Sequence, residues 1–140
     1  MQMKGKYTVM TNGRIGILKD DNGQVESIYV HCDADRIGKV LKKHYADKAK
    51  VEKLISLGDC SSIGPEVEPP EGAEHSYDNP IPGVTVAYVR DRDEDWDDCQ
   101  PSLHMDEATF WKSDFGYHGY LYKNGEWWTM KKYASEPKKV

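Results

Sequence analysis

The sequence predicts an α+β domain: an antiparallel or mixed sheet built on two β-hairpins, with two to three short helices packed on one side. Two Asn-Gly pairs, Asn22-Gly23 and Asn124-Gly125, each separate two β-prone runs. Both residue types tolerate a positive φ, so Asn-Gly is the strongest short-range signal for a hairpin. Between the hairpins, the apolar spacing changes from two residues to three and four, which is typical of helices. The order of strands and helices lacks the regular alternation of a doubly wound fold.

The first hairpin is expected to pair residues 14–19 with residues 25–31, and residues 7–10 are a candidate strand ahead of it. The second hairpin is expected at 117–122 and 126–130. Together with the elements between them, they form a single domain of residues 1–133, followed by a flexible tail at 134–140.

Two helices are expected after the first hairpin. Asp33 or Asp35 can cap the first of them, and Asp47 can cap the second, which ends at Gly58 as a C′ residue. A third, short helix is expected to begin at Asp106. The predicted buried positions of the first two helices are Ile37, Val40, Leu41, Tyr45, Ala49, Val51, Leu54 and Ile55.

The middle of the chain is expected to be irregular over residues 64–83, which are rich in Pro and Gly. Proline removes a backbone donor and glycine raises the cost of ordering, and a loop of this length inside a domain is often functional or mobile. Residues 84–90 are expected to form a central strand, because both of its faces are largely apolar. An acidic loop with one exposed tryptophan is expected at 91–98.

The charge of the chain restricts its partners. A formal net charge of −5 over 140 residues argues against general nucleic-acid binding, because phosphate backbones attract basic faces. Residues 33–53 and the tail from Lys131 are nevertheless rich in lysine. A local basic pocket for a small phosphate-bearing ligand therefore remains open.

The cysteines and the apolar pattern indicate a cytoplasmic protein without a membrane anchor. Cys32, Cys60 and Cys99 are far apart and odd in number, which fits neither a disulfide framework nor a zinc spacing. Reduced thiols are the expectation. No stretch approaches the about 20 apolar residues of a membrane-spanning helix, and no apolar run follows the first residues as in a signal peptide.

His31, Asp33 and Asp35 form an H-x-D-x-D pattern where a strand meets a helix. A nitrogen and two carboxylates are ligand types for a divalent metal, although a metal site needs further ligands. Helix capping by an aspartate, or contact of His31 and Asp33 with a ligand, are the alternatives. Of these possibilities, we predict that His31 and Asp33 contact a ligand. We expect no metal and no other cofactor.

Tyr88, Arg90 and Arg92 lie at the end of the expected central strand. Guanidinium groups offer fixed two-pronged geometry for phosphate or carboxylate, which makes this an anion site. Nearby carboxylates offer the alternative of a local ion-pair network. Trp127 and Trp128 are adjacent in a strand and point to opposite faces, so Trp127 is a candidate stacking surface and hairpin packing is the alternative.

The acidic residues at 91–98 do not form a calcium loop. Counted from Asp91, the sixth position is Trp96 and the twelfth is Ser102, whereas an EF-hand needs Gly and Glu there. A solvated loop or a surface that binds a partner are the two interpretations. No nucleophile elbow, Walker loop, dinucleotide fingerprint or zinc-protease motif is present, and no catalytic residue is expected.

Several of these segments resemble a family of small, largely uncharacterised bacteriophage and prophage accessory proteins with a strand-His-Trp-Asp-Gly-helix segment. Two departures lie in that segment, where Cys32 replaces the tryptophan of the family pattern and Ala34 replaces its glycine. The segments that carry the resemblance are 29–34, 38–45, Val51, 54–55, 57–59, 61–63, 88–92, 120–122 and 125–127.

The resemblance implies a phage accessory protein in the cytoplasm of the host bacterium, with a probable anti-defence role by stoichiometric binding. The expected ligand is a small anionic nucleotide immune signal, held like a sponge by His31, Asp33, Tyr88, Arg90, Arg92 and Trp127. The first alternative is an inhibitor that uses the acidic loop 91–98 to block a host or defence protein. A weaker one is a metal-dependent phosphoesterase. Uncovered sheet edges and one uncovered tryptophan also predict a homodimer or higher homo-oligomer.

Overall fold

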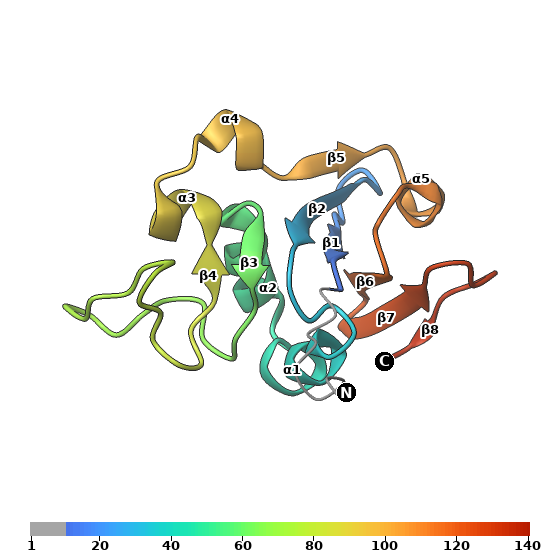
Figure 1. The fold of residues 1–140 in the computed structure, drawn as a ribbon. Helices are drawn as coiled ribbons and strands as arrows, with labels where there is room; N and C mark the ends of the chain where they lie inside the picture. Colours follow the sequence, from blue (N-terminus) through green and yellow to red (C-terminus); the bar gives the residue numbers. More distant parts are fainter. Residues whose placement is uncertain (1–10) are drawn as a thin grey trace, which may run out of the picture.

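The chain forms one mixed β-sheet with helices on both of its faces (Figure 1). A computed structural model describes residues 11–140, so the candidate strand at 7–10 lies outside the described residues. The strand order is β4-β3-β2-β1-β6-β7-β8. β5 lies outside this order and pairs with β2. The α+β class and the mixed sheet are confirmed.

Both predicted hairpins are confirmed and form the centre of the sheet. β1 (Gly13–Leu18) pairs antiparallel with β2 (Val25–Val30), and β6 (His118–Lys123) pairs antiparallel with β7 (Glu126–Lys131). Asn124 and Gly125 have φ of 52° and 77°, which is the positive-φ pair that a two-residue hairpin turn requires. The two hairpins join through β1 and β6, which run parallel.

Four short strands extend the sheet. β3 (Cys60–Ser62) pairs parallel with the end of β2, and β4 (Val86–Ala87) pairs antiparallel with β3 at one edge. β5 (Ser102–His104) pairs with the beginning of β2. At the other edge, β8 (Lys138–Lys139) pairs with β7, so the segment expected to be a flexible tail includes a sheet strand.

The main core lies on the face of the sheet that carries Ile15 and Ile28. Both side chains are fully buried, and α1 (Ile37–His44) and α2 (Lys48–Ser56) cover them. The positions predicted to be buried in these helices are confirmed at Ile37, Leu41, Tyr45, Val51, Leu54 and Ile55. Val40 is half-buried, and the prediction is wrong at Ala49, which is exposed. Gly58 follows α2 with a φ of 80°, as expected of a C′ residue.

A second, smaller core lies on the opposite face, where α5 (Glu107–Lys112) packs; the prediction had placed all helices on one side. The side chain of Asp106 caps α5 by accepting the Thr109 amide at 2.8 Å, as expected. Gly16 permits this packing, because a Cβ there would meet Phe110 at 3.2 Å and Val25 at 2.9 Å. This core covers the β6–β7 side of the face, and α5 does not extend over the β2–β3 side.

The segment 84–90 does not form the central strand that the sequence predicts. β4 spans two residues at the sheet edge, and α3 (Tyr88–Arg92) follows at once. The strand ends because the Asp91 carboxylate accepts the Ala87 amide at 2.8 Å. α4 (Trp96–Cys99) then leads to β5 across one end of the sheet (Figure 1).

The predicted aspartate cap of α1 is also absent, because the N-cap is Arg36 and no side chain bonds there. Instead, the backbone carbonyl of Asp33 accepts the amides of Arg36 and Ile37 at 2.8 Å and 3.2 Å. Asp47 does occupy the N-cap of α2, although its side chain makes no cap bond.

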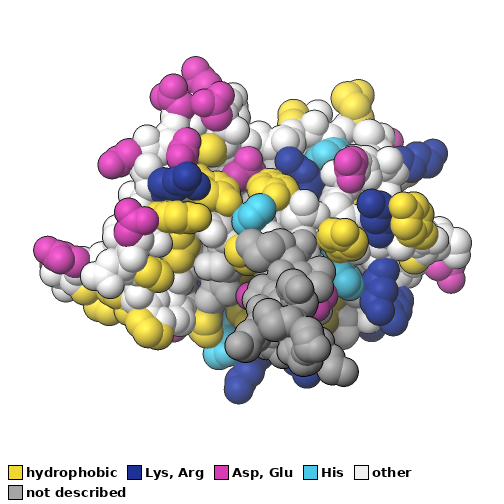
Figure 2. Space-filling view, viewed as in Figure 1, with side chains coloured by type: hydrophobic (Ala, Val, Ile, Leu, Met, Phe, Trp, Pro, Cys, Tyr) yellow, Lys and Arg dark blue, Asp and Glu magenta, His cyan; other side chains and the backbone are white. Residues whose placement is uncertain are grey.

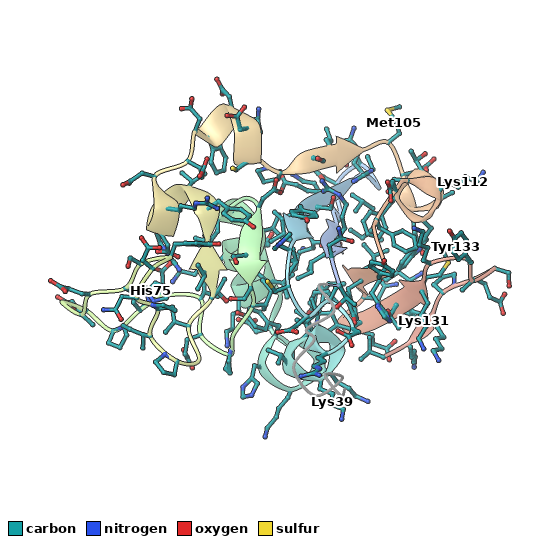
Figure 3. All side chains as sticks on the ribbon, viewed as in Figure 1. Lys39, His75, Met105, Lys112, Lys131 and Tyr133 are labelled. Carbon is teal, nitrogen blue, oxygen red and sulfur yellow. The ribbon has the colours of Figure 1, made fainter. Side chains whose placement is uncertain are left out.

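The long segment 64–83 is irregular, as predicted, and it is anchored by buried polar groups. His75, labelled in Figure 3, has a side chain that is 1% exposed. Its Nδ1 accepts the Ile81 amide at 2.9 Å, and its Nε2 lies 3.0 Å from the Thr85 carbonyl oxygen and 3.4 Å from Asp91. With Nδ1 as an acceptor, the ring proton is on Nε2, where it faces both oxygens.

Arg90 completes this anchor. Its Nε donates to Asp91 at 2.9 Å, and its two terminal nitrogens donate to the carbonyls of Val67 and Thr85, each at 2.7 Å. The side chain of Asp91 is only 3% exposed. Arg90 therefore ties the long loop to β4, as in the ion-pair alternative, and it does not face an open ligand site.

No helix within residues 11–140 is long and apolar enough to cross a membrane.

Replacing Arg90 with alanine is expected to lower the free energy of unfolding by about 3 kcal/mol, because it leaves the Asp91 carboxylate buried without its ion partner. Arg92→Ala is the matched control, since Arg92 pairs with Glu94 at the surface, where an ion pair contributes about 0–1 kcal/mol. Urea unfolding measures both variants. Equal losses in the two would contradict the anchoring role of Arg90.

Candidate functional site

The side of the second sheet face that α5 leaves open carries polar side chains from separate segments of the chain. Strand side chains alternate between faces, so the register that buries Ile15 and Ile28 places their neighbours here. Figure 2 shows basic, acidic, histidine and hydrophobic-class side chains, which include tyrosine, side by side on the face it views. We define the sheet-face site as Arg14, Ser27, Tyr29, His31, Asp59, Ser61, Tyr88 and His104.

Arg14, on β1, is the cation of this site. One terminal nitrogen donates to Ser27 Oγ at 2.8 Å, and Ser27 Oγ lies 2.8 Å from His104 Nε2. No other hydrogen bond or ion pair engages the guanidinium within residues 11–140. Burial lowers the pKa of Arg14, while Asp59 and Asp114 oppose that shift. The guanidinium nevertheless stays charged, because its ordinary pKa is above about 12.

Tyr29 and His31 form a hydrogen-bonded pair at the end of β2. The Tyr29 hydroxyl lies 2.9 Å from His31 Nδ1, and Asn12 Nδ2 approaches the same hydroxyl at 3.5 Å. The two rings are tilted with centroids 6.1 Å apart. His31 is therefore held by a neighbouring side chain at the site, as a ligand contact would require.

Asp59 comes directly before β3, and its side chain bonds to the backbone of β2. Its carboxylate accepts the Tyr29 amide at 2.8 Å. Burial raises the pKa of Asp59, and the Tyr29 amide and Arg14 oppose that shift. The carboxylate therefore carries its charge at an energetic cost that its two neighbours reduce.

Ser61 links the next two side chains. Its side chain lies close to both Tyr88 and Cys32 and favours the ionised form of each, which opposes the effect of burial. Burial raises the pKa of Tyr88 to about 12 and also raises the pKa of Cys32. Both groups are therefore protonated at neutral pH, so Tyr88 offers a hydroxyl and a ring, and Cys32 is a thiol and not a thiolate nucleophile.

Arg92 forms the outer rim beside Tyr88. Its guanidinium lies 4.5 Å from the ring centroid of Tyr77 and 5.9 Å from that of Tyr88. It also pairs with Glu94 at 3.3 Å and is 47% exposed. The rim is a stack of cation and aromatic rings that solvent reaches.

The predicted site residues are divided by the fold. His31 and Tyr88 belong to the sheet-face site, and Arg92 lies at its rim. Asp33 is exposed, with a left-handed φ of 59°, and no hydrogen bond or ion pair in residues 11–140 joins its carboxylate to the site.

Trp127 does not provide the predicted stacking surface. It is 5% exposed, and its indole nitrogen donates to the Tyr45 carbonyl at 2.9 Å inside the main core. Its side chain points to the Ile15 face, because Tyr122 opposite it shares that face. Its strand neighbour Trp128 is half-buried on the other face, where Lys123 lies 4.9 Å from its ring.

The H-x-D-x-D pattern does not form a metal site in the described part of the chain. No group of three His, Cys, Asp or Glu side chains there is placed to hold a metal ion. Asp35 instead accepts a hydrogen bond from the Thr11 hydroxyl at 2.6 Å, which is the main cause of its lowered pKa.

Sequence reasoning missed six residues of the sheet-face site: Arg14, Ser27, Tyr29, Asp59, Ser61 and His104. The alternation along β1 and β2 contained the signal for two of them, because Arg14 and Tyr29 are each next to a buried isoleucine. The spacing of Asp59 and Ser61 in the sequence does not show which strands they meet.

The raised pKa of Asp59 has a consequence for stability. The folded carboxyl holds its proton more tightly than the unfolded one, so its contribution to stability is present below the unfolded pKa and is lost as the pH rises through the folded pKa. Asp59→Asn keeps an oxygen for the Tyr29 amide and carries no charge. This variant is expected to have a higher Tm than the wild type at pH 7.

Thermal unfolding across pH measures this effect. The difference between the two proteins is expected to close as the pH falls below about 4, the ordinary aspartate pKa. Asp97→Asn, at an exposed aspartate of α4, is the control and is expected to change little. A lower Tm for Asp59→Asn at pH 7 would show that attraction to Arg14 outweighs burial.

Comparison of the chain with protein-family models, with curated proteins and with solved structures finds no match. The functional argument therefore rests on the geometry of the sheet-face site.

Proposed function

We propose that the chain binds a small anionic, nucleotide-like ligand at the sheet-face site and acts by sequestering it. The observation that carries this proposal is the state of Arg14. Its guanidinium has one protein partner within residues 11–140, so most of its donors have no partner in that part of the chain. A guanidinium with available donors in a partly buried position suits two-pronged recognition of phosphate.

The groups around Arg14 suit the remainder of a nucleotide. The rings of Tyr29, Tyr88 and Tyr77 offer surfaces on which a base can stack, a contact of roughly 1–3 kcal/mol per base. The Ser61 and Tyr88 hydroxyls and the His31 ring offer hydrogen bonds. Binding without chemistry is supported by the raised pKa of Cys32, which leaves the nearest thiol protonated.

The resemblance to phage accessory proteins supplies the biological setting of this proposal. Four of the segments that carry it contribute to the site or its rim: 29–34, 57–59, 61–63 and 88–92. Their meeting on one face is what a shared binding surface would produce. In this setting, the ligand is an immune nucleotide signal and the protein is an anti-defence sponge in the cytoplasm of the host.

A second candidate function uses the acidic segment 91–98. Asp93, Glu94, Asp95, Asp97 and Asp98 are exposed, and Trp96 among them is 44% exposed. An aromatic residue surrounded by carboxylates suits a basic surface on a protein partner, as the inhibitor alternative requires. Asp91 takes no part in such a surface, because it is buried against Arg90.

Within residues 11–140, the structure does not contain the uncovered tryptophan that suggested a homodimer. Trp127 is buried, Trp128 lies beneath lysines, and β8 pairs with the exposed side of β7. Self-association stays a prediction, and it now lacks the uncovered tryptophan as its reason.

Arg14→Lys is the sharpest test of the sponge, because it keeps the positive charge and removes the planar fork. Binding of the nucleotide that stabilises the wild type is expected to weaken by roughly 10- to 100-fold, the scale of a hydrogen bond to a charged group. Isothermal calorimetry against cyclic and linear nucleotides measures this. Lys112→Arg, a charge-conserving exchange at an exposed residue of α5, is the control and is expected to bind like the wild type.

Recovered nucleotide is expected to be chemically unchanged after incubation with the protein. Cleaved nucleotide would identify an enzyme and overturn sequestration. If no nucleotide binds the wild type, the sheet-face proposal fails and the acidic segment becomes the leading surface.

A further inference from the structure

A second cavity lies on the other side of the sheet, between the start of α1 and strands β6, β7 and β8. Its volume is about 550 Å³, which lies within the usual range of small-molecule sites. Tyr120 lines it and shares its face with Ile15, its partner in the β1–β6 register. The sheet therefore separates this α1–β8 cavity from Arg14, which faces the opposite side.

Four cations surround the α1–β8 cavity. Arg36 and Lys39 come from the start of α1, Lys131 from the end of β7, and Lys138 from β8. Lys39 and Lys131 lie on the same lower side of the molecule in Figure 3. The fold thus brings together the two basic stretches of a chain whose net charge is −5.

The positive charge of these four groups is not neutralised by protein partners. None of them lies within 4.0 Å of a carboxylate in the described residues, whereas Lys139 nearby pairs with Glu126 at 2.7 Å. Asp35 is the acidic residue of the lining, and its carboxylate is bonded to Thr11. Like charges around one hollow repel each other, and a bound anion relieves that repulsion.

The floor of the cavity is apolar and closely packed. A Cβ on Gly38 would lie 3.2 Å from the Tyr120 ring and 3.3 Å from the Val140 side chain, so α1 begins directly against both. The Tyr120 hydroxyl donates to the Ala34 carbonyl at 2.5 Å, which fixes the ring. The His118 ring lies nearly parallel to that of Tyr120, at an interplanar angle of 15°.

His118 itself adds no positive charge at neutral pH. Burial and Lys131 lower its pKa, while Asp35 opposes them. The ring is therefore neutral, and the charge of the cavity comes from the arginine and the three lysines. Their long aliphatic stems also add apolar surface beneath the charged ends.

We propose that the α1–β8 cavity binds a small organic anion with a flat apolar body and a phosphate or carboxylate head. The body lies against Tyr120 and Val140, and the head is held by the cations at the rim. This site is independent of the sheet-face site, because its lining contains none of the same residues.

The test uses three aromatic probes of similar shape: 1-naphthyl phosphate, 1-naphthoate and uncharged 1-naphthol. Calorimetry at low salt is expected to show binding of one or both anions and much weaker binding of the naphthol. The two anionic probes distinguish a phosphate from a carboxylate head. Lys39→Gln and Lys131→Gln are each expected to weaken binding of the preferred anion about tenfold, the scale of a charged hydrogen bond.

Two matched controls exclude general attraction to a basic surface. Lys43→Gln on α1 and Lys132→Gln after β7 remove the same charge from neighbouring positions outside the cavity lining. Both are expected to bind like the wild type. Equal losses in cavity and control variants, equal binding of naphthol, or no binding of either anion would overturn the proposal.

Discussion

The alternation of side chains along β1 and β2 is the constraint on which both faces of the molecule depend. Ile15 and Ile28 are fully buried against α1 and α2. Because strand side chains alternate with a period of two, burying these isoleucines fixes Arg14, Ser27 and Tyr29 on the opposite face. A shift of one residue in this register would bury a guanidinium and expose the core.

The helix α5 completes this division. It covers the β6–β7 side of the second face through Phe110 and Trp111, and glycines at 16 and 119 make room for aromatic rings. The side it leaves open receives residues from β3, α3 and β5, which the chain brings to the same end of the sheet. A polar surface thus arises where one sheet face is only half covered, and that surface contains Arg14, whose guanidinium has one protein partner within residues 11–140.

Local signals in the sequence were sufficient for the hairpins and for three of the helices. Asn124-Gly125 determines its own turn, and the spacing of Leu41, Tyr45 and Leu54 determines buried helix faces within a few residues. The conversion of the predicted central strand into β4 and α3 was not predictable in this way. It depends on Asp91, whose carboxylate lies against Arg90 of the same helix and against His75. His75 comes from the long loop, which meets this helix only in the folded protein.

The candidate site shows the same limit. His31 and Tyr88 were found from residue type and position, but Arg90 was preferred to Arg14. Residue type cannot show which guanidinium has its donors filled by carbonyls and a buried carboxylate. Similarly, the sequence places Trp127 and Trp128 on opposite faces but does not show that Trp127 is the buried one, since that depends on the distant Tyr45 carbonyl.

The most direct measurement of the central claim is the change in backbone amide NMR shifts when a stabilising nucleotide is added. The account predicts that the largest changes cluster at Arg14, Tyr29, His31, Ser61 and Tyr88, while Arg90 and the loop it anchors change little. Shifts centred on the acidic segment 91–98 or on the α1–β8 cavity, with Arg14 and Tyr29 unaffected, would contradict it.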